Sequence, residues 1–465
     1  MLAGLFPFVL FLCAVIGLIV AVLMPWFWVT IAAIPIFGLG SSYFFNKKNF
    51  FAAEIFLLII FVLIFAAWAQ ACARNSLDRF YTGDHIFNIK VITVPRPAKR
   101  FNICLVKIDG FSEKIKIVDY TRRLDYLGRY EISGSLVKRL YHGCFFYLIF
   151  QPKDAKIKCV DLNFLERTSR DISRYTLKRL KDNFSDMTYR FLSSLFLGRY
   201  ELLYTERQIF IDTGTTHLLA ISGLHMVLVS ATIFFILGLF GLSHSFRLVV
   251  ASLVIFGYTF LSGISPSALR AAIMFSVLSM GFFLRRTSSS LNILGIAGVI
   301  SFIGDPQILV DIGFQLSYLS IFALALFSYI FPQDREGNFF INEFEQLFNI
   351  SLWVGIFLLP VVSYYFGKIY IGAFMYNIVL IPLCNLILLI VFIMFCFFPV
   401  KFLLLPLAAV LEPLSVFFIY LNKSFGSGPL SSCDFRFNLF GVCLYYIVFM
   451  AVFIFYRYNK KHEKI

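Results

Sequence analysis

The sequence predicts an α-helical polytopic membrane protein with about 10–12 spans and a small all-β, OB-like extracytoplasmic insert. Three observations support this fold class. Of the 465 residues, 60% are hydrophobic, and the mean hydropathy is +0.83. Apolar runs of about twenty residues recur along the chain, which is the length that crosses a bilayer. A polar stretch from about Arg74 to Asp182 interrupts these runs. The composition excludes an ordinary soluble globular protein.

An N-terminal membrane region is expected over residues 1–70. It holds three apolar runs: Leu2–Leu23, Trp26–Gly40 and Phe50–Trp68. The first run lacks a basic start and a small-residue cleavage site, so we expect it to be retained as a span. Lys47 and Lys48 separate the second and third runs, and the positive-inside rule places them in the cytoplasm. The N-terminus is then cytoplasmic and the third run ends at the outer face.

Residues 74–160 are predicted to form an OB-fold-like soluble domain. β-Branched and aromatic residues, punctuated by Gly and Pro, indicate five short strands: His85–Val94, Phe101–Lys107, Lys114–Val118, Tyr130–Val137 and Phe145–Phe150. Short strands of this number fit a small barrel, and the OB-fold is a barrel that binds single strands. A small sandwich would produce the same pattern.

Residues 161–212 are expected to form basic amphipathic helices. The predicted apolar stripe is Phe164, Leu165, Ile172, Leu177, Leu180, Phe184 and Met187. Four basic residues share another face: Arg170, Arg174, Lys178 and Lys181. Such a helix lies on anionic lipid or follows a phosphate backbone. The alternative is a helix docked on the barrel with its charges in water.

The net charge of +15 is concentrated in this polar region, because residues 71–200 hold 25 Lys and Arg but 13 Asp and Glu. A positive field of this strength attracts nucleic acid or anionic lipid, although a solvated basic surface without a partner is the plainer interpretation. Basic residues also alternate with aromatic ones here. If the partner is DNA, the residues expected to bind it are Arg100, Arg129, Arg139, Arg170, Arg174, Lys178 and Lys181.

Residues 213–457 form the second predicted membrane domain. Its candidate spans are His217–Leu242, Leu248–Leu261, Ser267–Leu284, Leu291–Phe302, Leu309–Phe331, Leu352–Tyr370, Phe374–Phe397, Phe402–Leu421 and Leu439–Tyr456. Alternating these spans from an insert on the outer face places Arg285 and Arg286 in the cytoplasm. The same alternation makes residues 458–465 a basic cytoplasmic tail.

Cysteine usage gives little further information. Six of the nine cysteines lie in or beside apolar runs, where Cys behaves as a small hydrophobic residue. Cys104, Cys144 and Cys159 lie in the polar insert, so one disulfide among them is chemically allowed if the insert is extracytoplasmic. The sequence has no CxxC pair and no metal-ligand spacing, and we expect neither a metal nor a cofactor.

The most informative motif is HLLAISGLHM, from His217 to Met226. Histidines, Ser222 and Gly223 are costly at membrane depth and usually face a bundle interior or an aqueous path. His217 and His225 are eight positions apart, about 80° around a helix, so we expect them on one broad face. The motif predicts a polar lining for the passage of an anionic or polar substrate. Helix packing through small residues, a proton relay or zinc pair, and nucleophilic catalysis by Ser222 are the alternatives.

Three more polar clusters follow within apolar sequence. In LSGISPSALRAA, Gly263 and Pro266 separate two spans and place Arg270 about one turn into the second. A buried arginine must pair, reach water or meet an anion, whereas an arginine near the interface snorkels.

The third cluster is GDPQILVDIGFQLSYLS, in which Asp311, Gln315 and Ser317 enter an apolar stretch. Asp311 and Gln315 are four positions apart and therefore share one face of a helix. From that face Asp311 could pair with Arg270 of another helix in a bundle. In the fourth, MYNIVLIP, Asn377 and Pro382 indicate either a discontinuous transport helix or an ordinary proline kink.

These four clusters, in this order over about residues 190–385, resemble the ComEC family of inner-membrane DNA-uptake channels of natural competence. The resemblance implies a passage for one DNA strand, delivered by an outer-face receptor and drawn in by a cytoplasmic motor. The family positions transfer to channel-lining or structural polar residues here: His217, Ser222, Gly223, His225, Gly263, Arg270, Asp311, Gln315, Ser317 and Asn377.

Many members of that family carry a C-terminal metallo-β-lactamase-like domain, whereas this sequence reaches Ile465 without an HxHxDH string. We therefore expect a non-enzymatic channel without catalytic residues, located in the bacterial cytoplasmic membrane with both termini in the cytoplasm. A secondary transporter of a small anion or lipid, with the insert as a docking module, is the main alternative. A membrane hydrolase that uses Ser222 and His225 is the third.

Overall fold

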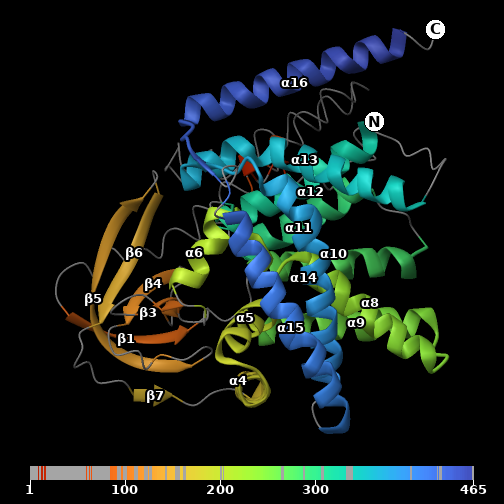
Figure 1. Ribbon diagram of the computed structural model, residues 1–465. Coiled ribbons are helices and arrows are strands. Elements are labelled where there is room, and N and C mark those ends of the chain that lie inside the picture. The colour runs from red at the N-terminus through yellow and green to blue at the C-terminus, as the bar shows by residue number, and fades with distance from the viewer. Residues whose placement is uncertain are drawn as a thin grey trace. The chain divides into compact units, whose positions relative to one another are not determined.

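The protein is described by a computed structural model of residues 1–465 (Figure 1). The residues that it describes are 84–91, 96–97, 102–108, 114–119, 128–141, 144–151, 158–160, 164–198, 204–262, 266–285, 289–304, 311–330, 339–397, 401–426 and 432–462, with isolated positions elsewhere. The three N-terminal apolar runs fall outside these ranges, apart from scattered helical positions. Their predicted spans stay a prediction.

The chain divides into two compact units, each built from separate segments. Unit 1 comprises Met1–Leu202, Leu218–Asp311 and Asn385–Val416. Unit 2 comprises Leu203–His217, Ile312–Cys384 and Phe417–Ile465.

The polar insert of unit 1 folds into a closed β-barrel. Its strands are β1 (Asp84–Val91), β2 (Arg96–Pro97), β3 (Asn102–Ile108), β4 (Lys114–Asp119), β5 (Arg129–Tyr141), β6 (Cys144–Gln151) and β7 (Lys158–Val160). All five predicted strands are present, and β2 and β7 are additional short ones. The hydrogen-bonded order is β1-β3-β4-β6-β5, and β5 pairs back with β1 to close the barrel. Every pairing is antiparallel except β4 with β6, which is parallel.

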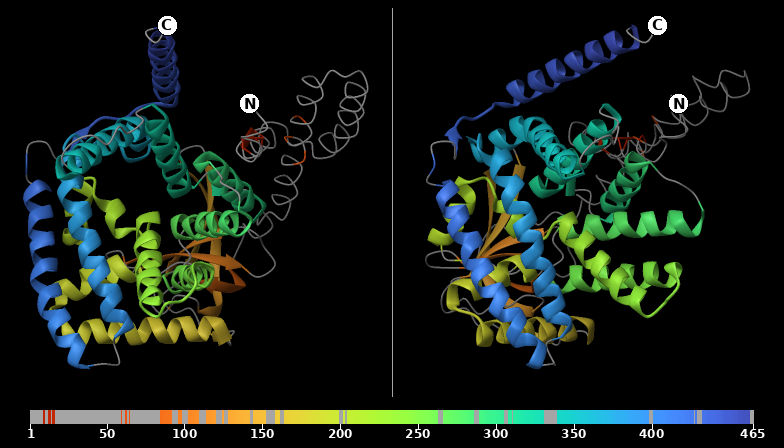
Figure 2. Two further views of the ribbon diagram at one scale, coloured as in Figure 1. Left: turned by 90° about the vertical axis from the view of Figure 1, so that its right-hand side faces the viewer. Right: turned by 45° about the vertical axis from the view of Figure 1, so that its right-hand side comes forward.

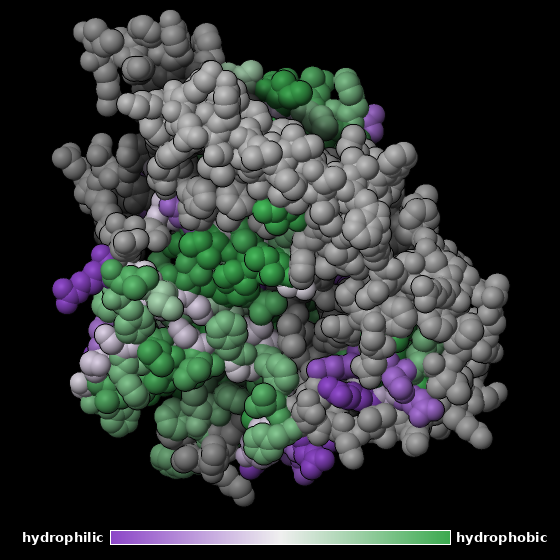
Figure 3. Space-filling view, turned by 180° about the vertical axis from the view of Figure 1, so that it is seen from behind, coloured by the Kyte–Doolittle hydropathy of each residue, from purple (hydrophilic) through white to green (hydrophobic). Residues whose placement is uncertain are grey.

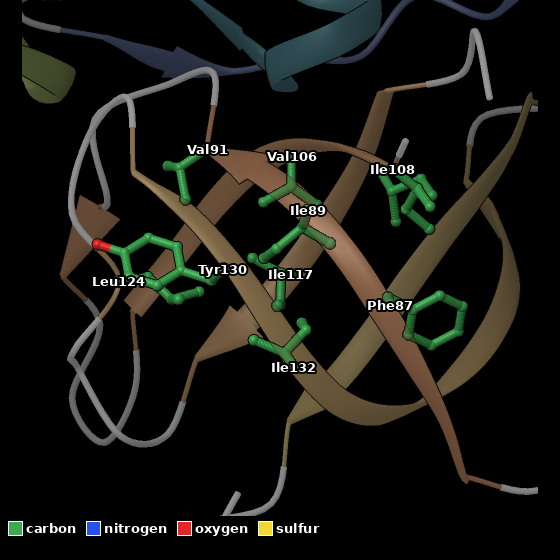
Figure 4. Close-up of a cluster of buried hydrophobic side chains, with 10 residues drawn as sticks. Phe87, Ile89, Val91, Val106, Ile108, Ile117, Leu124, Tyr130 and Ile132 are labelled. Carbon is green, nitrogen blue, oxygen red and sulfur yellow. The ribbon is translucent and has the colours of Figure 1, made fainter. Parts of the chain in front are cut away.

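Alternating apolar residues of these strands fill the barrel. Ten buried side chains form its core: Phe87, Ile89, Val91, Val106, Ile108, Ile115, Ile117, Leu124, Tyr130 and Ile132. Figure 4 shows nine of them labelled, pointing toward one another between the strands. Because successive strand residues belong to opposite faces, the residues between them lie on the outer face of the barrel.

Helices α4 (Phe164–Asn183) and α5 (Asp186–Leu197) follow the barrel and confirm the helical prediction for this segment. The predicted apolar stripe of α4 is wrong in part, since Phe164 and Leu165 are 80% and 70% exposed. The buried face instead carries Ser169, Ser173, Thr176, Leu180 and Phe184. These mostly small side chains allow close packing against α5 and α9, and the Thr176 hydroxyl donates to the Ile172 carbonyl oxygen at 2.8 Å.

The helical part of unit 1 continues with α8 (Gly223–Leu239), α9 (His244–Leu261), α10 (Pro266–Phe283) and α11 (Ser290–Gly304). Helices α8, α9 and α10 pack against one another, and α10 also packs against α11. The four lie side by side in both views of Figure 2, in green shades. Pro266 is the first residue of α10, where a proline costs no hydrogen bond, so the predicted break between two spans is confirmed.

Unit 2 is built around α12 (Ile312–Ile330) and α13 (Phe339–Phe366), which pack together, with α16 (Leu439–His462) against α13. The short helices α6 (Tyr204–Asp212) and α7 (Thr216–Leu219) come earlier in the chain. Strands β8 (Lys368–Ile369) and β9 (Cys433–Asp434) pair as a small ribbon. Helices α14 (Ala373–Cys396) and α15 (Lys401–Gly426) contribute to both units.

Four of the described helices are long and apolar enough to cross a membrane: His244–Leu261, Phe348–Phe366, Ala373–Cys396 and Leu404–Gly426. The shorter apolar helices are Gly223–Leu239, Ser267–Phe283, Ser290–Gly304, Ile312–Ser328 and Leu439–Phe449. Many large apolar side chains of these helices are exposed, and apolar residues cover much of the described surface in Figure 3. This surface suits lipid better than water and agrees with a membrane protein.

Candidate functional site

The second half of the HLLAISGLHM motif forms the start of α8. Ser222 is the N-cap residue, and its extended backbone (φ −119°, ψ 173°) ends the preceding segment. The Nδ1 atom of His225, in the first turn, lies 2.9 Å from the Ser222 hydroxyl and accepts from the Ser222 N–H at 3.4 Å. An imidazole thus takes the place that Glu or Gln holds in a capping box. Since Nδ1 accepts a backbone hydrogen bond, the proton of the neutral ring lies on Nε2.

The start of α8 lies against the start of α10. A Cβ atom built on Gly223 would lie 3.9 Å from the Ala271 Cβ, so the first turn of α8 faces the second turn of α10 at close range. Gly223 is the first residue of α8. Gly223 belongs to the first predicted cluster and Ala271 to the second, so these two clusters approach each other in unit 1.

The ends of α5 and α9 reach the same place. Gly198 caps α5 with a left-handed backbone (φ +63°), and a Cβ there would lie 3.1 Å from Ile221 and 3.3 Å from the Ser262 carbonyl oxygen. Only glycine meets both conditions without strain. Farther back, the Tyr258 hydroxyl of α9 donates to the Phe196 carbonyl oxygen of α5 at 2.6 Å. Four helix ends therefore converge in unit 1.

Arg270 is the largest fully buried side chain among the described residues, at 1% exposure. A snorkelling arginine keeps its guanidinium at the surface, so this burial excludes that alternative. His225 is buried nearly as deeply, at 4%. Two helix N-termini and two C-termini meet here, so their macrodipoles offset each other. Arg270 therefore places a positively charged group deep among the helices of unit 1.

His217 does not join this site, because the predicted continuous helix from His217 to Leu242 is wrong. His217 lies in α7 and in unit 2, whereas His225 lies in α8 and in unit 1. The exposed His217 ring donates from Nδ1 to the Gly214 carbonyl oxygen at 3.1 Å. The expected shared face of the two histidines is lost because the backbone between α7 and α8 is not helical.

Residues 213–215, between α6 and α7, form a polar loop in unit 2 that the sequence analysis did not single out. The Thr213 and Thr215 hydroxyls lie 2.7 Å apart, and Thr215 donates to Oδ1 of Asn422 at 3.2 Å, with all three residues fully buried. At the rim, Asp212 pairs with Lys368 at 3.3 Å.

The third and fourth clusters also belong largely to unit 2. Gln315 lies in α12 and accepts a 2.8 Å hydrogen bond from the Tyr365 hydroxyl, and Ser317 is half-buried. Asp311 is exposed and precedes the first residue of α12, at the boundary of unit 1. Its pairing with Arg270 stays a prediction.

Asn377 is half-buried in α14, with its Oδ1 atom buried. The helix runs through Pro382 without a break, so the discontinuous-helix interpretation is wrong. Gly263 and Arg100 lie outside the described residues.

The other predicted DNA-binding residues lie on two elements. Arg129 and Arg139 are in β5, at positions paired with Lys90 and Phe146. Arg170 is half-buried, 3.8 Å from the Asp171 carboxylate. Three further basic side chains are exposed on α4: Arg174, Lys178 and Lys181.

Sequence reasoning missed one carboxylate within an apolar helix. Glu412 in α15 accepts hydrogen bonds from Ser185 and Thr188 at the start of α5. Its isolated position in an apolar run was the signal that could have found it. The described residues contain no group of three or more His, Cys, Asp or Glu that could hold a metal ion.

The apolar helices, four of which are long enough to cross a membrane, and the β-barrel are those of a mostly helical membrane protein with a small β-domain. The family model described as "Competence protein" matches residues 195–459, which is more than half of the chain. The chain belongs to the competence protein family. It is 31% identical over 169 residues to "ComE operon protein 3" of Bacillus subtilis (strain 168). That match covers 36% of this chain and 21% of the relative, so the chain spans about a fifth of it. No solved structure matches the chain.

Proposed function

We propose that this chain carries single-stranded DNA across the bacterial cytoplasmic membrane during DNA uptake in competence. Family membership and the similarity to "ComE operon protein 3" support the role in competence. The observation that carries the transport role is Arg270, a cation fully buried in the apolar helix α10, whose next residue, Ala271, lies opposite the first turn of α8. A polyanion needs a positively biased, hydrated path through hydrocarbon, and intramembrane ionisable residues mark such paths.

The barrel is proposed to be an OB-fold. Counted as five barrel strands, its order is first, second, third, fifth and fourth, and the fourth pairs back with the first. The third and fifth strands, β4 and β6, are parallel. This is the connectivity of a five-stranded Greek-key barrel, the architecture with which OB-folds bind oligonucleotides. A sandwich would leave its sheet unclosed, so the pairing of β1 with β5 favours the barrel.

In this proposal the barrel lies on the outer side of the membrane, and both termini are cytoplasmic. The basic barrel and α4 receive a strand from an outer-face DNA receptor, and a cytoplasmic motor draws it in. The chain acts as a non-enzymatic channel without a cofactor, with Arg270, His225 and Ser222 on or supporting the path. Gln315, Ser317 and Asn377 are proposed to be channel-lining or structural polar residues of unit 2.

A transformation assay tests this function. Deleting the gene from a transformable host should abolish entry of labelled DNA into the cytoplasm while surface-bound DNA is retained. Complementation with the wild-type gene should restore entry. Arg270→Ala at wild-type protein levels should not restore it, whereas Arg270→Lys should restore part of it because it keeps the charge but not the planar fork.

Two results would refute the proposal. Normal transformation in the deletion strain would remove the DNA role altogether. Normal DNA entry with Arg270→Ala, at equal protein levels, would show that the buried charge is not part of the path. Loss of uptake of a small anion or lipid in the deletion strain, with DNA entry unchanged, would favour the secondary transporter.

A further inference from the structure

Pro360 interrupts the backbone hydrogen bonds of α13, one of the four described helices that are long and apolar enough to cross a membrane. Because proline has no backbone N–H, the carbonyl group four residues earlier, that of Ile356, loses its donor within the helix. No water replaces this donor in hydrocarbon, so a neighbouring helix has to satisfy the carbonyl group.

Two consecutive tyrosines of α16 donate to two consecutive carbonyl groups at this place. The Tyr445 hydroxyl donates to the Ile356 carbonyl oxygen at 2.9 Å. The Tyr446 hydroxyl donates to the Phe357 carbonyl oxygen at 2.8 Å. The first of these carbonyl groups is the one that Pro360 deprives of its donor. Tyr445 therefore replaces the missing N–H, and Tyr446 adds a second hydrogen bond at the next residue.

Aromatic rings join α13 and α16 at the same level. Phe357 is 4% exposed, and its ring centroid lies 5.4 Å from the centroids of Tyr446 and Phe449. The Phe449 ring also lies 5.5 Å from that of Trp353. Phenylalanine would fill the same space as tyrosine, so packing explains the rings but not the two hydroxyls.

The segment that leads into α16 holds α13 on the other side of Pro360. The fully buried Ser363 hydroxyl donates to the Phe435 carbonyl oxygen and accepts from the Phe437 N–H at 3.2 Å. One short stretch of chain thus contacts α13 both before and after the proline. We call this stretch, residues 435–446, the C-terminal clamp.

The part of α13 beyond the proline carries a polar contact with α12. The Tyr365 hydroxyl donates to Oε1 of Gln315 at 2.8 Å. Tyr365 lies five positions after Pro360, so the direction that the helix takes at the proline decides where this hydroxyl lies. The clamp and the Gln315 contact are therefore connected through the bend of one helix.

We propose that Tyr445 and Tyr446 are positioning residues, which set the bend of α13 at Pro360 and thereby hold the Tyr365 hydroxyl on Gln315. The effect on the shape of α13 is independent of what the protein transports. Its consequence for DNA entry rests on the proposed function, in which Gln315 is one of the polar residues of the channel domain.

A double-mutant cycle on the full chain, unfolded in mixed micelles by a denaturing detergent, tests the role of the proline. Tyr445→Phe removes only the hydroxyl, and in the chain with Pro360 it should raise the unfolding equilibrium constant at least about threefold. In Pro360→Ala the alanine N–H supplies the helical donor to Ile356. There, adding Tyr445→Phe should raise the constant by less than about 1.5-fold, because the carbonyl group keeps a partner.

The matched control is Tyr258→Phe, which removes a hydroxyl that donates to the Phe196 carbonyl oxygen of another helix pair at 2.6 Å. Its effect should be the same with proline or alanine at position 360. Equal effects of Tyr445→Phe with and without the proline would overturn the proposal.

Hydrogen exchange of the full chain in nanodiscs gives a local measurement that does not depend on complete unfolding. Tyr445→Phe and Tyr446→Phe, singly and together, should speed the exchange of residues 361–366 and leave that of α9 unchanged. A merely destabilised protein would exchange faster in both places. Unchanged exchange in residues 361–366, or an equal increase in α9, would refute the positioning role.

DNA entry in a transformable host tests the last step. Tyr365→Phe removes the hydroxyl that donates to Gln315 and should lower DNA entry at wild-type protein levels. Tyr445→Phe/Tyr446→Phe should lower it to a similar extent, and all three changes together should lower it no further, because they act through one contact.

The arms separate the two proposals. Additive losses of DNA entry would overturn the connection between the clamp and Gln315. Normal transformation in the deletion strain would remove the proposed function, whereas the unfolding cycle and the hydrogen exchange, which need no DNA, would still confirm or refute the action of the clamp on α13.

Discussion

The hydroxyl of Ser185 donates a 2.6 Å hydrogen bond to Oε1 of Glu412, across 227 positions of the sequence. Ser185 is the N-cap of α5, and its backbone N–H lies 3.3 Å from the other carboxylate oxygen. The Thr188 hydroxyl adds a third contact at 2.9 Å. A carboxylate at the positive end of a helix dipole is favourable. The contact fixes α15 to the start of α5, the helix whose other end reaches the Arg270 site.

The first prediction concerns this contact. In a double-mutant cycle, Ser185→Ala and Glu412→Gln should show a coupling free energy of about 1 kcal/mol, because each change removes the same charged hydrogen bond. The measurement is unfolding of the full chain in mixed micelles with increasing denaturing detergent. Ser328→Ala, at an exposed helical position, should not couple to Glu412→Gln. Additive effects of Ser185→Ala and Glu412→Gln would contradict the prediction.

The second prediction concerns Gly198. Gly198→Ala should lower the free energy of unfolding by about 1–3 kcal/mol, because alanine is strained at positive φ and its Cβ would press on the Ser262 carbonyl oxygen. The matched control is Gly257→Ala within α9, where nothing lies within 4 Å of the added Cβ. That change should leave stability equal or raise it by up to about 1 kcal/mol. Equal destabilisation by both changes would show that packing at the α5 end is not tight.

The third prediction concerns the buried loop of unit 2. Thr215→Val keeps the side-chain shape but removes the hydroxyl that donates to Asn422. A buried group left without its partner costs about 1–3 kcal/mol, so the free energy of unfolding should fall by that amount. Thr216→Val, which removes a half-buried hydroxyl that donates to the Phe210 carbonyl oxygen, should cost less. The reverse ranking would contradict the importance of the Thr215 contact with Asn422.

The fourth prediction separates the channel from a hydrolase. The Ser222–His225 distance of 2.9 Å would suit a nucleophile and a base, but the same contact also caps α8. Ser222→Ala should reduce DNA entry no more than about threefold, since losing a cap costs about 1 kcal/mol. His225→Gln should keep the cap, because Gln serves at this position of a capping box. Complete loss of DNA entry with Ser222→Ala, at normal protein levels, would instead support nucleophilic catalysis.

The strands and the breaks between helices were predictable because they depend on neighbouring residues. The run Lys114–Val118 alternates polar and apolar side chains up to Ile117, and β4 covers it. Pro266 cannot continue a helix from its N-terminal side, and α10 begins there. The break before Ser222 was missed, because its apolar surroundings matched those of a span and the cap contact with His225 needs three-dimensional geometry.

The sequence alone determined that this is a membrane protein of the competence type with a basic β-insert, because composition, run length and motif order are properties of the linear chain. Only the tertiary structure decided which polar groups meet. Burial of Arg270, the small-residue face of α4 and the partner of Glu412 depend on helices far apart in sequence. Strand register likewise decided which basic residues are neighbours on the barrel, since a shift of one residue between β1 and β3 would separate Lys90 from Lys107.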